Sequence, residues 1–165
     1  MPSCTFFGHG DCPDSIRPAV AKAIIQMVLQ HKVDFFYVGN QGRFDQIVLS
    51  ELRVLKTLGE IKDLFNYAVV LPYVPTKQPF YIRYLPEETM LPEGIETVHP
   101  KYAIVKRNNW MLDHSEHVIA FVIHSWGGAA QYVSKARQKQ KHILHIVPND
   151  IPSSQGDTTN LRSSQ

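Results

Sequence analysis

Apolar residues along this chain fall alternately into short runs and into stripes with helical spacing. Residues 4–7 form a short apolar run that stops at a glycine, and residues 16–28 carry a stripe with helical spacing. A second run at 33–38 is followed by a second stripe at 44–58. A short apolar run is typical of a buried strand, and a 3.6-residue period is typical of a helix. The pattern in the first half of the chain therefore predicts two strand–helix units.

The second half of the chain resumes this alternation after an interruption. A third run lies within residues 66–73, and helical spacing returns over residues 102–113. The run 118–123 ends in a glycine turn that leads into a helix beginning near Ala129, and residues 142–147 form a fifth run. The pattern therefore predicts five strands that alternate with helices.

Two segments do not follow the pattern. Residues 72–100 contain six prolines among several aromatic residues, so we interpret this segment as a lid or as an excursion at the edge of the sheet. Residues 149–165 are polar and have no apolar period, and we expect a disordered tail there. One domain over residues 1–148 is the simplest organisation for a chain of 165 residues.

Alternating strands and helices indicate an α/β fold that is Rossmann-like and doubly wound, with a parallel five-stranded sheet and helices on both faces. The simplest strand order is 3-2-1-4-5, in which the direction of winding reverses between the first and the fourth strand. The loop after the first strand and the glycine turn after the fourth then face each other across a crevice. Ligands bind at such a reversal in open α/β sheets.

The predicted crevice combines glycine turns with polar side chains. Backbone N–H groups at a helix N-terminus bind anions, so the turn before Ala129 predicts a phosphate site. The loop after the second strand lies one strand away, and the helix over residues 102–113 adds a polar face. The candidate ligand-binding residues are Gly8, His9, Gly10, Gly39, Asn40, Gln41, Gly42, Arg43, Arg107, Asn108, His124, Ser125, Trp126, Gly127, Gly128 and Ala129.

Composition and charge narrow the class of protein. Seventeen lysines and arginines against fifteen aspartates and glutamates leave a formal charge of +2, which argues against a dedicated nucleic-acid binder. The first residues lack the pattern of a signal peptide, and no run approaches the roughly 18 apolar residues of a membrane helix. Two cysteines suit a reducing compartment. We therefore expect a cytoplasmic protein without a membrane partner.

Other chemistries fit the residues less well. The Gly8-His9-Gly10 turn lacks the third glycine of the dinucleotide fingerprint, which argues against an ordinary NAD dehydrogenase. A thiol at a helix N-terminus can have a lowered pKa, but no fixed base lies beside Cys12, and we expect a spectator. Several histidines have no acidic or cysteine partner at ligand spacing, so we predict no metal and no other cofactor. These histidines are His114, His117, His124, His142 and His145.

Five motifs, in this order and spacing, resemble the SLOG superfamily, which joins the DNA-processing protein A (Smf) group to the Lonely Guy phosphoribohydrolases. The motifs are FFGHGDCP, FYVGNQGRFD, LPEGIE, KRNNWM and HSWGGA, and the resemblance runs from about Cys4 to Val147. It suggests a small single-domain bacterial or phage member with a Rossmann-like fold. It also implies a crevice that binds nucleotides or nucleotide-derived ligands, in some members with cleavage of a base from a ribose phosphate.

The resemblance to the Lonely Guy enzymes is uneven. These enzymes share an arginine in a helix motif, and a PGGxGTxxE turn whose glutamate works with that arginine on the N-glycosidic bond. By this resemblance Arg107 is the candidate catalytic residue, and Gly127 and Gly128 match the paired glycines. Trp126 replaces the proline, and Ser134 stands at the glutamate position. Loss of a carboxylate that stabilises an oxocarbenium-like transition state argues against hydrolysis by that mechanism.

Two hypotheses of function follow. The first is a binding module for a nucleotide or for an NAD-like or ADP-ribose-like ligand, with Arg43 or Arg107 as the countercharge for phosphate. The second is a nucleoside 5′-monophosphate N-glycosidase or ribosyl transferase, in which a carboxylate from another loop replaces the missing one. The carboxylates considered are Asp11, Asp45 and Glu93. Single-stranded nucleic acid is a third and less favoured candidate ligand. Separately, the stripe at 16–28 could serve an interface between two copies of the chain.

Overall fold

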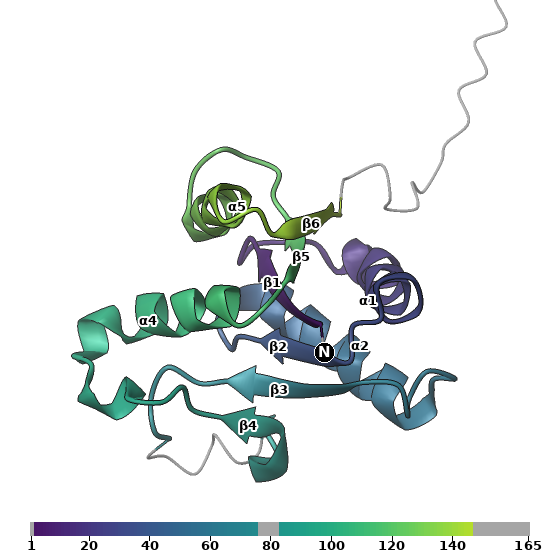
Figure 1. Cartoon of the computed structure of the whole chain (residues 1–165), viewed down its shortest axis with the longest axis horizontal. Coiled ribbons are helices and arrows are strands. Elements are labelled where there is room, and N and C mark those ends of the chain that lie inside the picture. The colour runs from purple at the N-terminus through teal and green to yellow at the C-terminus, as the bar shows by residue number, and fades with distance from the viewer. Residues whose placement is uncertain (1, 76–82, 147–165) are drawn as a thin grey trace, which may run out of the picture.

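A parallel β-sheet with helices on both faces makes up the described part of the chain, which in this computed structural model comprises residues 2–75 and 83–146 (Figure 1). The strands are β1 (Ser3–Gly8), β2 (Phe35–Val38), β3 (Asn66–Val70), β4 (Thr89–Met90), β5 (His117–Phe121) and β6 (His142–His145). The α-helices are α1 (Arg17–His31), α2 (Gly42–Leu58), α4 (Pro100–Asp113) and α5 (Gly128–Gln138). The 3-10 helices are η1 (Asp14–Ile16), η2 (Pro86–Glu88) and η3 (Ile95–Thr97). Within the described ranges, no helix combines the length and the apolar character that crossing a bilayer requires.

The strands of the described residues form one six-stranded sheet in the order β4-β3-β2-β1-β5-β6, with every neighbouring pair parallel. The predicted α/β class and parallel sheet are confirmed, but the prediction of five strands in the order 3-2-1-4-5 is wrong. The difference is β4, which extends the sheet beyond β3 by pairing Thr89 with Val69 and Met90 with Val70. Two residues within a proline-rich segment are too few to show a period, so the pattern of apolar residues did not reveal this strand.

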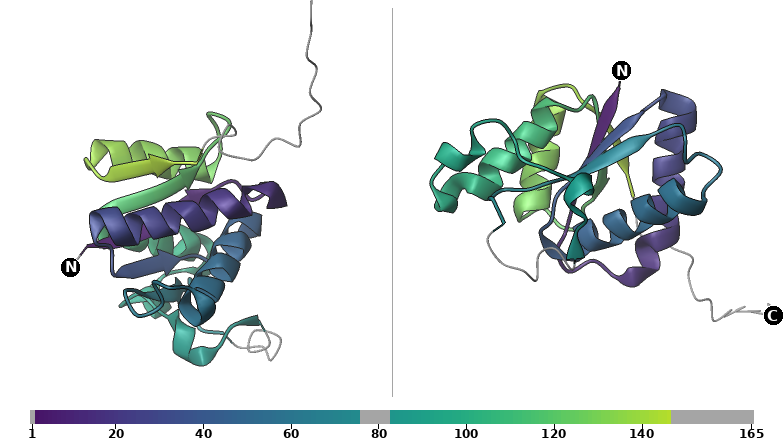
Figure 2. Two further views of the ribbon diagram at one scale, coloured as in Figure 1. Left: turned by 90° about the vertical axis from the view of Figure 1, so that its right-hand side faces the viewer. Right: turned by 90° about the horizontal axis from the view of Figure 1, so that it is seen from below.

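Helices cover both faces of the sheet (Figure 2). Side chains alternate along the central strands and divide the core between these two faces. Phe6 of β1 packs with residues of α1 and α2 on one face, whereas Phe7 packs with residues of α4 and α5 on the other. In β5, Ile119 and Val118 are divided in the same way. Because both faces of the central strands are buried, these strands are almost continuously apolar, as parallel sheets require.

The direction of winding reverses at β1, which lies between β2 and β5. Helices on one face follow β1 and β2, and helices on the opposite face flank β5. The carboxyl ends of β1 and β5 lie side by side, because Gly8 is paired with Phe121. The sheet therefore has its topological switch point between these two strands, where the crevice was expected.

The apolar stripe at residues 16–28 packs inside the molecule. Ile16, Val20, Ile24 and Met27 are fully buried and belong to the core between α1, α2 and the sheet. The idea that this stripe serves an interface between two copies is therefore wrong, because its apolar face already packs against the rest of the fold.

The described residues of the proline-rich segment include the edge strand of the sheet. These residues contribute η2, β4 and η3, and none of them lines the cavity at the switch point. The two interpretations of the whole segment, a lid or an edge excursion, remain predictions. Residues 76–82 of this segment lie outside the described residues, as do the predicted domain boundary at 148 and the predicted disordered tail at 149–165.

A buried carboxylate attaches this edge to the rest of the fold. Glu88 accepts hydrogen bonds from Arg53 Nε (2.9 Å) and Nη2 (2.8 Å) of α2, from the backbone N–H of Leu85 (2.9 Å) and from the hydroxyl of Tyr67 (3.2 Å). Burial by itself would raise the pKa of Glu88, but the hydrogen bonds from Arg53 and Leu85 outweigh burial and lower it. Glu88 is therefore ionised and paired, and it connects α2, β3 and η2.

Replacing Arg53 with alanine should lower the free energy of unfolding by about 1–3 kcal/mol, because it leaves the buried Glu88 carboxylate without its main donor, although Arg53 itself is partly exposed. Urea unfolding measures this loss. Arg17→Ala is the matched control, because it breaks a longer ion pair of 3.5 Å with Glu51 and should cost less than about 1 kcal/mol. Equal losses for the two variants would contradict the anchoring role of Glu88.

Candidate functional site

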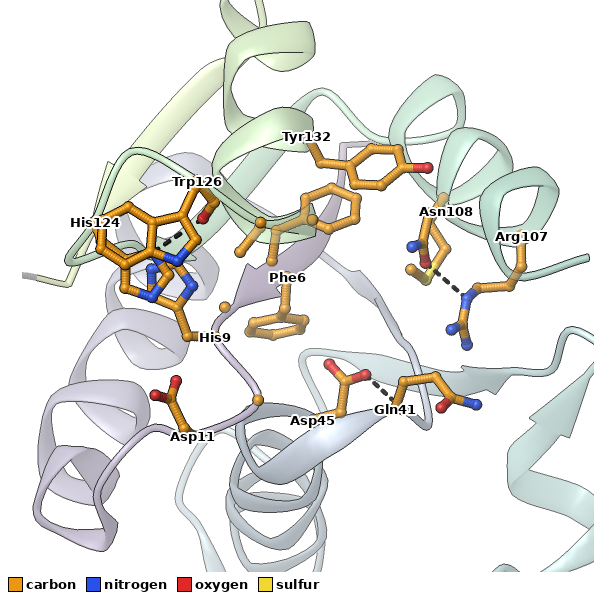
Figure 3. Close-up of a pocket in the computed structure, with 17 residues that line it drawn as sticks. Phe6, His9, Asp11, Gln41, Asp45, Arg107, Asn108, His124, Trp126 and Tyr132 are labelled. Carbon is orange, nitrogen blue, oxygen red and sulfur yellow. Dashed lines mark hydrogen bonds between the residues drawn. The ribbon is translucent and has the colours of Figure 1, made fainter. Parts of the chain in front are cut away.

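A cavity of about 410 Å³ opens at the carboxyl ends of β1 and β5 (Figure 3). Its walls come from the loops after β1, β2 and β5, from the start of α2 and α5, and from one face of α4. The predicted binding residues that line it are Gly8, His9, Gly10, Gln41, Arg107, Asn108, His124, Trp126, Gly127, Gly128 and Ala129. The fold therefore brings together most of the residues that the sequence analysis selected from four separate segments.

Three stacked rings form one side of the cavity. The ring centroid of His9 lies 3.6 Å from that of His124, which in turn lies 4.0 Å from that of Trp126, and the rings of each pair are nearly parallel. His9 Nε2 accepts a hydrogen bond from the backbone N–H of Ile123 (3.0 Å), so the neutral ring carries its proton on Nδ1. Burial and the neighbouring His124 lower the pKa of His9, while Asp11 opposes them. His9 is therefore a neutral ring in a fixed position, and His124 stacks on it.

The glycine turn before α5 offers backbone donors to the same cavity. Gly127 is the N-cap of α5 and has a φ of +92°, a conformation that other residues rarely adopt. No side chain of the described residues caps this helix end, and Gly127, Gly128 and Ala129 all line the cavity. The first N–H groups of a helix have no partner within the helix and lie at the positive end of its dipole. This turn is therefore suited to an anion.

Arg107 extends from α4 on the side opposite the stacked rings (Figure 3) and is almost completely buried. Its Nη1 donates to Asn40 Oδ1 and to the carbonyl of Val70, both at 2.9 Å, and its Nε donates to Asn108 Oδ1 at 2.7 Å. Burial lowers the pKa of Arg107, and the carboxylate of Asp45 partly offsets this effect. Among residues 2–75 and 83–146, the hydrogen bonds described for the Arg107 guanidinium come from Nη1 and Nε, and none comes from Nη2.

Asp45 lies in the first turn of α2 and lines the cavity with Asp11. One oxygen of Asp45 accepts a hydrogen bond from the backbone N–H of Gln41 at 2.9 Å. Burial raises the pKa of Asp45 to about 6, although Gln41 and Arg107 both act to lower it. The cavity therefore contains a carboxyl group that changes its protonation close to neutral pH.

Five predicted binding residues do not line this cavity. They are Gly39, Asn40, Gly42, Arg43 and Ser125. Arg43 forms an ion pair with Asp14 and donates to Gln46, and Ser125 borders a shallower hollow on the outer side of α5. Asn40 acts indirectly by orienting Arg107.

Several of the glycines are explained by close packing. A Cβ atom on Gly8 would lie 2.2 Å from the ring of Phe44, and one on Gly42 would lie 2.9 Å from the Cα of Gly10. Gly39 is similarly close to Asp45 and Arg107. The contacts at Gly8 and Gly42 fall below the separation that real Cβ atoms show, so glycine is needed at these two positions whether or not a ligand is bound.

Some residues that line the cavity were not predicted as binding residues from the sequence. Asp11 and Asp45 were considered only as replacements for a missing glutamate, and Tyr132 was not considered. Tyr132 stacks on Phe7 at 4.9 Å, and its hydroxyl lies 3.5 Å from the carbonyl of Val105. An acidic residue in a first helical turn is normally attributed to the helix dipole, so only the position of α2 beside β1 reveals that Asp45 faces the cavity.

Cys12 does not contribute a nucleophile. The side chain is buried, and burial raises the pKa of Cys12 to about 11. A thiol with such a pKa carries little thiolate near neutral pH. This agrees with its expected role as a spectator.

Replacing Asp45 with asparagine should remove a pH dependence of stability. Because the pKa of Asp45 is raised to about 6 in the folded chain, its ionisation opposes folding, and the stability present below about pH 4 is lost as the pH rises through about 6. Between about pH 4 and pH 8, the free energy of unfolding of the wild type should therefore fall by roughly 1–3 kcal/mol more than that of Asp45→Asn, and urea unfolding measures this difference. Asp63→Asn, at an exposed position, is the control and should follow the wild type. Parallel curves for the wild type and Asp45→Asn would contradict the raised pKa.

Comparison with known proteins identifies a solved structure of similar fold. No family model matches the chain, and no curated protein matches it. Its structure is similar to the X-ray structure of DNA processing protein A (DprA) from Streptococcus pneumoniae, with a TM-score of 0.59 and 15% sequence identity. The similarity covers 97% of this chain and 52% of the other, so this chain spans about half the length of the solved structure. The resemblance to the DNA-processing protein A group is thereby confirmed at the level of the fold.

Proposed function

We propose that this chain binds a nucleotide or a nucleotide-derived ligand of the NAD or ADP-ribose kind in the cavity at the switch point. The observation that carries the proposal is the combination of features around this one cavity. A helix N-terminus without a side-chain cap lies next to the stacked rings, and a buried arginine lies on the opposite side. The volume of about 410 Å³ lies within the usual range of about 300–1,000 Å³ for small-molecule sites.

The phosphate of such a ligand would bind at the start of α5. The turn at Gly127 and Gly128 supplies backbone N–H groups, and a Cβ atom on Gly128 would meet nothing within 4 Å. The space beside Gly128 is therefore open to a ligand atom. Phosphates bind at helix N-termini because the N–H groups and the helix dipole both favour negative charge.

The base of the ligand would lie against the stacked rings. Trp126 is 69% exposed, which is unusual for a large aromatic side chain, yet its ring is held by His124 and through it by buried His9. A planar base stacks on such a surface and covers the exposed indole. Trp126 directly precedes the phosphate turn at Gly127 and lines the same cavity, so one ligand would contact both.

Charges of both signs would orient the sugar and the phosphate. Arg107 lines the cavity and is the better countercharge than Arg43, because Arg43 does not line it and is already paired with Asp14. Asp11 and Asp45 are acceptors suited to ribose hydroxyl groups. A ligand with several hydroxyl groups and a single phosphate or diphosphate matches this mixture better than a highly charged anion does.

Asp45 supports a second candidate function, the N-glycosidase. Hydrolysis of an N-glycosidic bond needs a carboxylate near the developing positive charge of the sugar, and the residue at the family position is Ser134. Asp45 supplies a carboxyl group from another helix, with a pKa of about 6 in the same cavity as Arg107. A carboxyl group that titrates near neutral pH is suited to acid–base work or to stabilisation of that charge.

The binding proposal is tested by thermal shift against nucleoside 5′-monophosphates, NAD and ADP-ribose. A short single-stranded DNA is included because the solved structure of similar fold is that of a DNA processing protein. A ligand at about 100 times its Kd should raise the melting temperature by roughly 5–10 °C for a domain of this size. A shift with DNA alone, weakening steeply with salt, would replace the proposal with nucleic-acid binding.

The position of the site is tested by two valine substitutions in the first turn of α5. Gly128→Val fills the open space next to the backbone and should abolish most of the thermal shift while leaving the unliganded melting temperature nearly unchanged. Ala130→Val adds a β-branched side chain two residues along, at a position that does not line the cavity, and should retain the shift. If Gly128→Val binds as tightly as the wild type, the phosphate does not bind at this turn.

Catalysis is tested by chromatography of free base after incubation with each nucleotide. Release of base by the wild type, lost by at least about 100-fold in Asp45→Asn with the thermal shift retained, would establish the N-glycosidase with Asp45 as its carboxylate. Recovery of intact ligand after prolonged incubation would favour the binding module over the enzyme. Equal release by the wild type and Asp45→Asn would exclude Asp45 from the chemistry.

A further inference from the structure

A second group of functional side chains lies at the opposite end of the sheet. His31 is the last residue of α1, His117 is the first residue of β5, and His142 is the first residue of β6. Because β5 and β6 are parallel and begin at these residues, the group lies at the amino ends of the strands, away from the cavity at their carboxyl ends. The group is therefore separate from the proposed nucleotide site.

The backbone fixes the position of each histidine. His117 and His142 are partners in the register of β5 and β6, so their side chains project side by side from the same face of the sheet. The backbone N–H of His142 also donates to the carbonyl of Glu116 at 3.1 Å. Helix α1 ends at His31 because Lys32 adopts a left-handed conformation, and its N–H bonds back to the carbonyl of Met27. No rearrangement of the chain is needed to bring the three rings together.

The three imidazoles are close enough to share one ion. One nitrogen from each ring lies within 4.8 Å of the corresponding nitrogen of the other two. His117 Nδ1 and His142 Nδ1 are 2.8 Å apart, and the ring of His31 is 4.5 Å from that of His142. Tetrahedral zinc with Zn–N bonds of about 2.0–2.1 Å places its nitrogens about 3.3 Å apart. Small rotations about the side-chain bonds reach that spacing.

The chemistry and the position of the group suit a metal ion. A neutral imidazole offers one nitrogen lone pair to an ion, and exposed His142 gives an ion access from solvent.

We propose that His31, His117 and His142 bind one divalent transition-metal ion of the zinc type, with a fourth coordination position left for water or another ligand. Three imidazoles select zinc, nickel or copper over magnesium and calcium, which prefer oxygen ligands. The ion would join the end of α1 to β5 and to the edge strand β6. The histidines considered from the sequence alone included His117 and His142 but not His31, which only the folded chain brings beside them.

The test is titration of the metal-free protein with Zn²⁺ by calorimetry, and with Co²⁺ by visible absorption, which reports tetrahedral coordination. The wild type should bind one ion per chain, and His117→Gln and His142→Gln should each bind at least about tenfold more weakly. His145→Gln is the matched control, because His145 lies on β6 but projects from the opposite face, and it should bind like the wild type.

The melting temperature without metal shows whether each variant is folded, and His142→Gln changes an exposed residue, so at least one variant tests the ligand set. Unchanged binding in both ligand variants, or an equal loss in His145→Gln, would overturn the proposal, as would the absence of Zn²⁺ binding by the wild type. Gly128→Val should keep its metal affinity, so this result is independent of the nucleotide test.

Discussion

A positive charge buried within the fold organises the site at the switch point. A buried guanidinium needs hydrogen bonds, because each one offsets part of its large desolvation cost. Arg107 meets this requirement with the carbonyl at the end of β3, with Asn40 after β2 and with Asn108 of its own helix. The same residue therefore attaches α4 to two strands and defines one wall of the cavity. Gly39 belongs to this arrangement because a side chain there would collide with Asp45 and Arg107.

The sequence was sufficient for those parts of the fold that depend on local periodicity. The stripe at 44–58 predicted α2 within two residues, and the runs of apolar residues located β1, β2, β3, β5 and β6. The switch point followed from general rules of connection in parallel sheets, and it correctly brought His9 and Trp126 to one cavity. These successes share a cause, since burial of both sheet faces imposes an unmistakable pattern on strands and helices alike.

Features that depend on distant packing were not predictable in the same way. The glycines after β1 and β2 were selected as ligand contacts, yet Gly8 is required by the ring of Phe44, which is 36 residues away. Asp45 has the position of an ordinary helix-dipole residue, and its raised pKa arises only from the surroundings that α2 meets. His31 illustrates the same limit, because no spacing along the chain relates the end of α1 to the starts of β5 and β6. The sheet edge at β4 had no local signal at all.

The short β4 has a consequence for behaviour in concentrated solution. A long, flat edge strand presents unpaired N–H and C=O groups on which another chain can add, and this is a common route to aggregation. Here β3 is covered at its carboxyl end by a strand of two residues that is bracketed by Pro86 and Pro92. Prolines lack the N–H group that a further strand would need, and the buried Glu88 holds this cover in place. The proline-rich segment thus prevents a further strand from adding to this edge of the sheet. A longer and more regular strand would leave the edge open to such pairing.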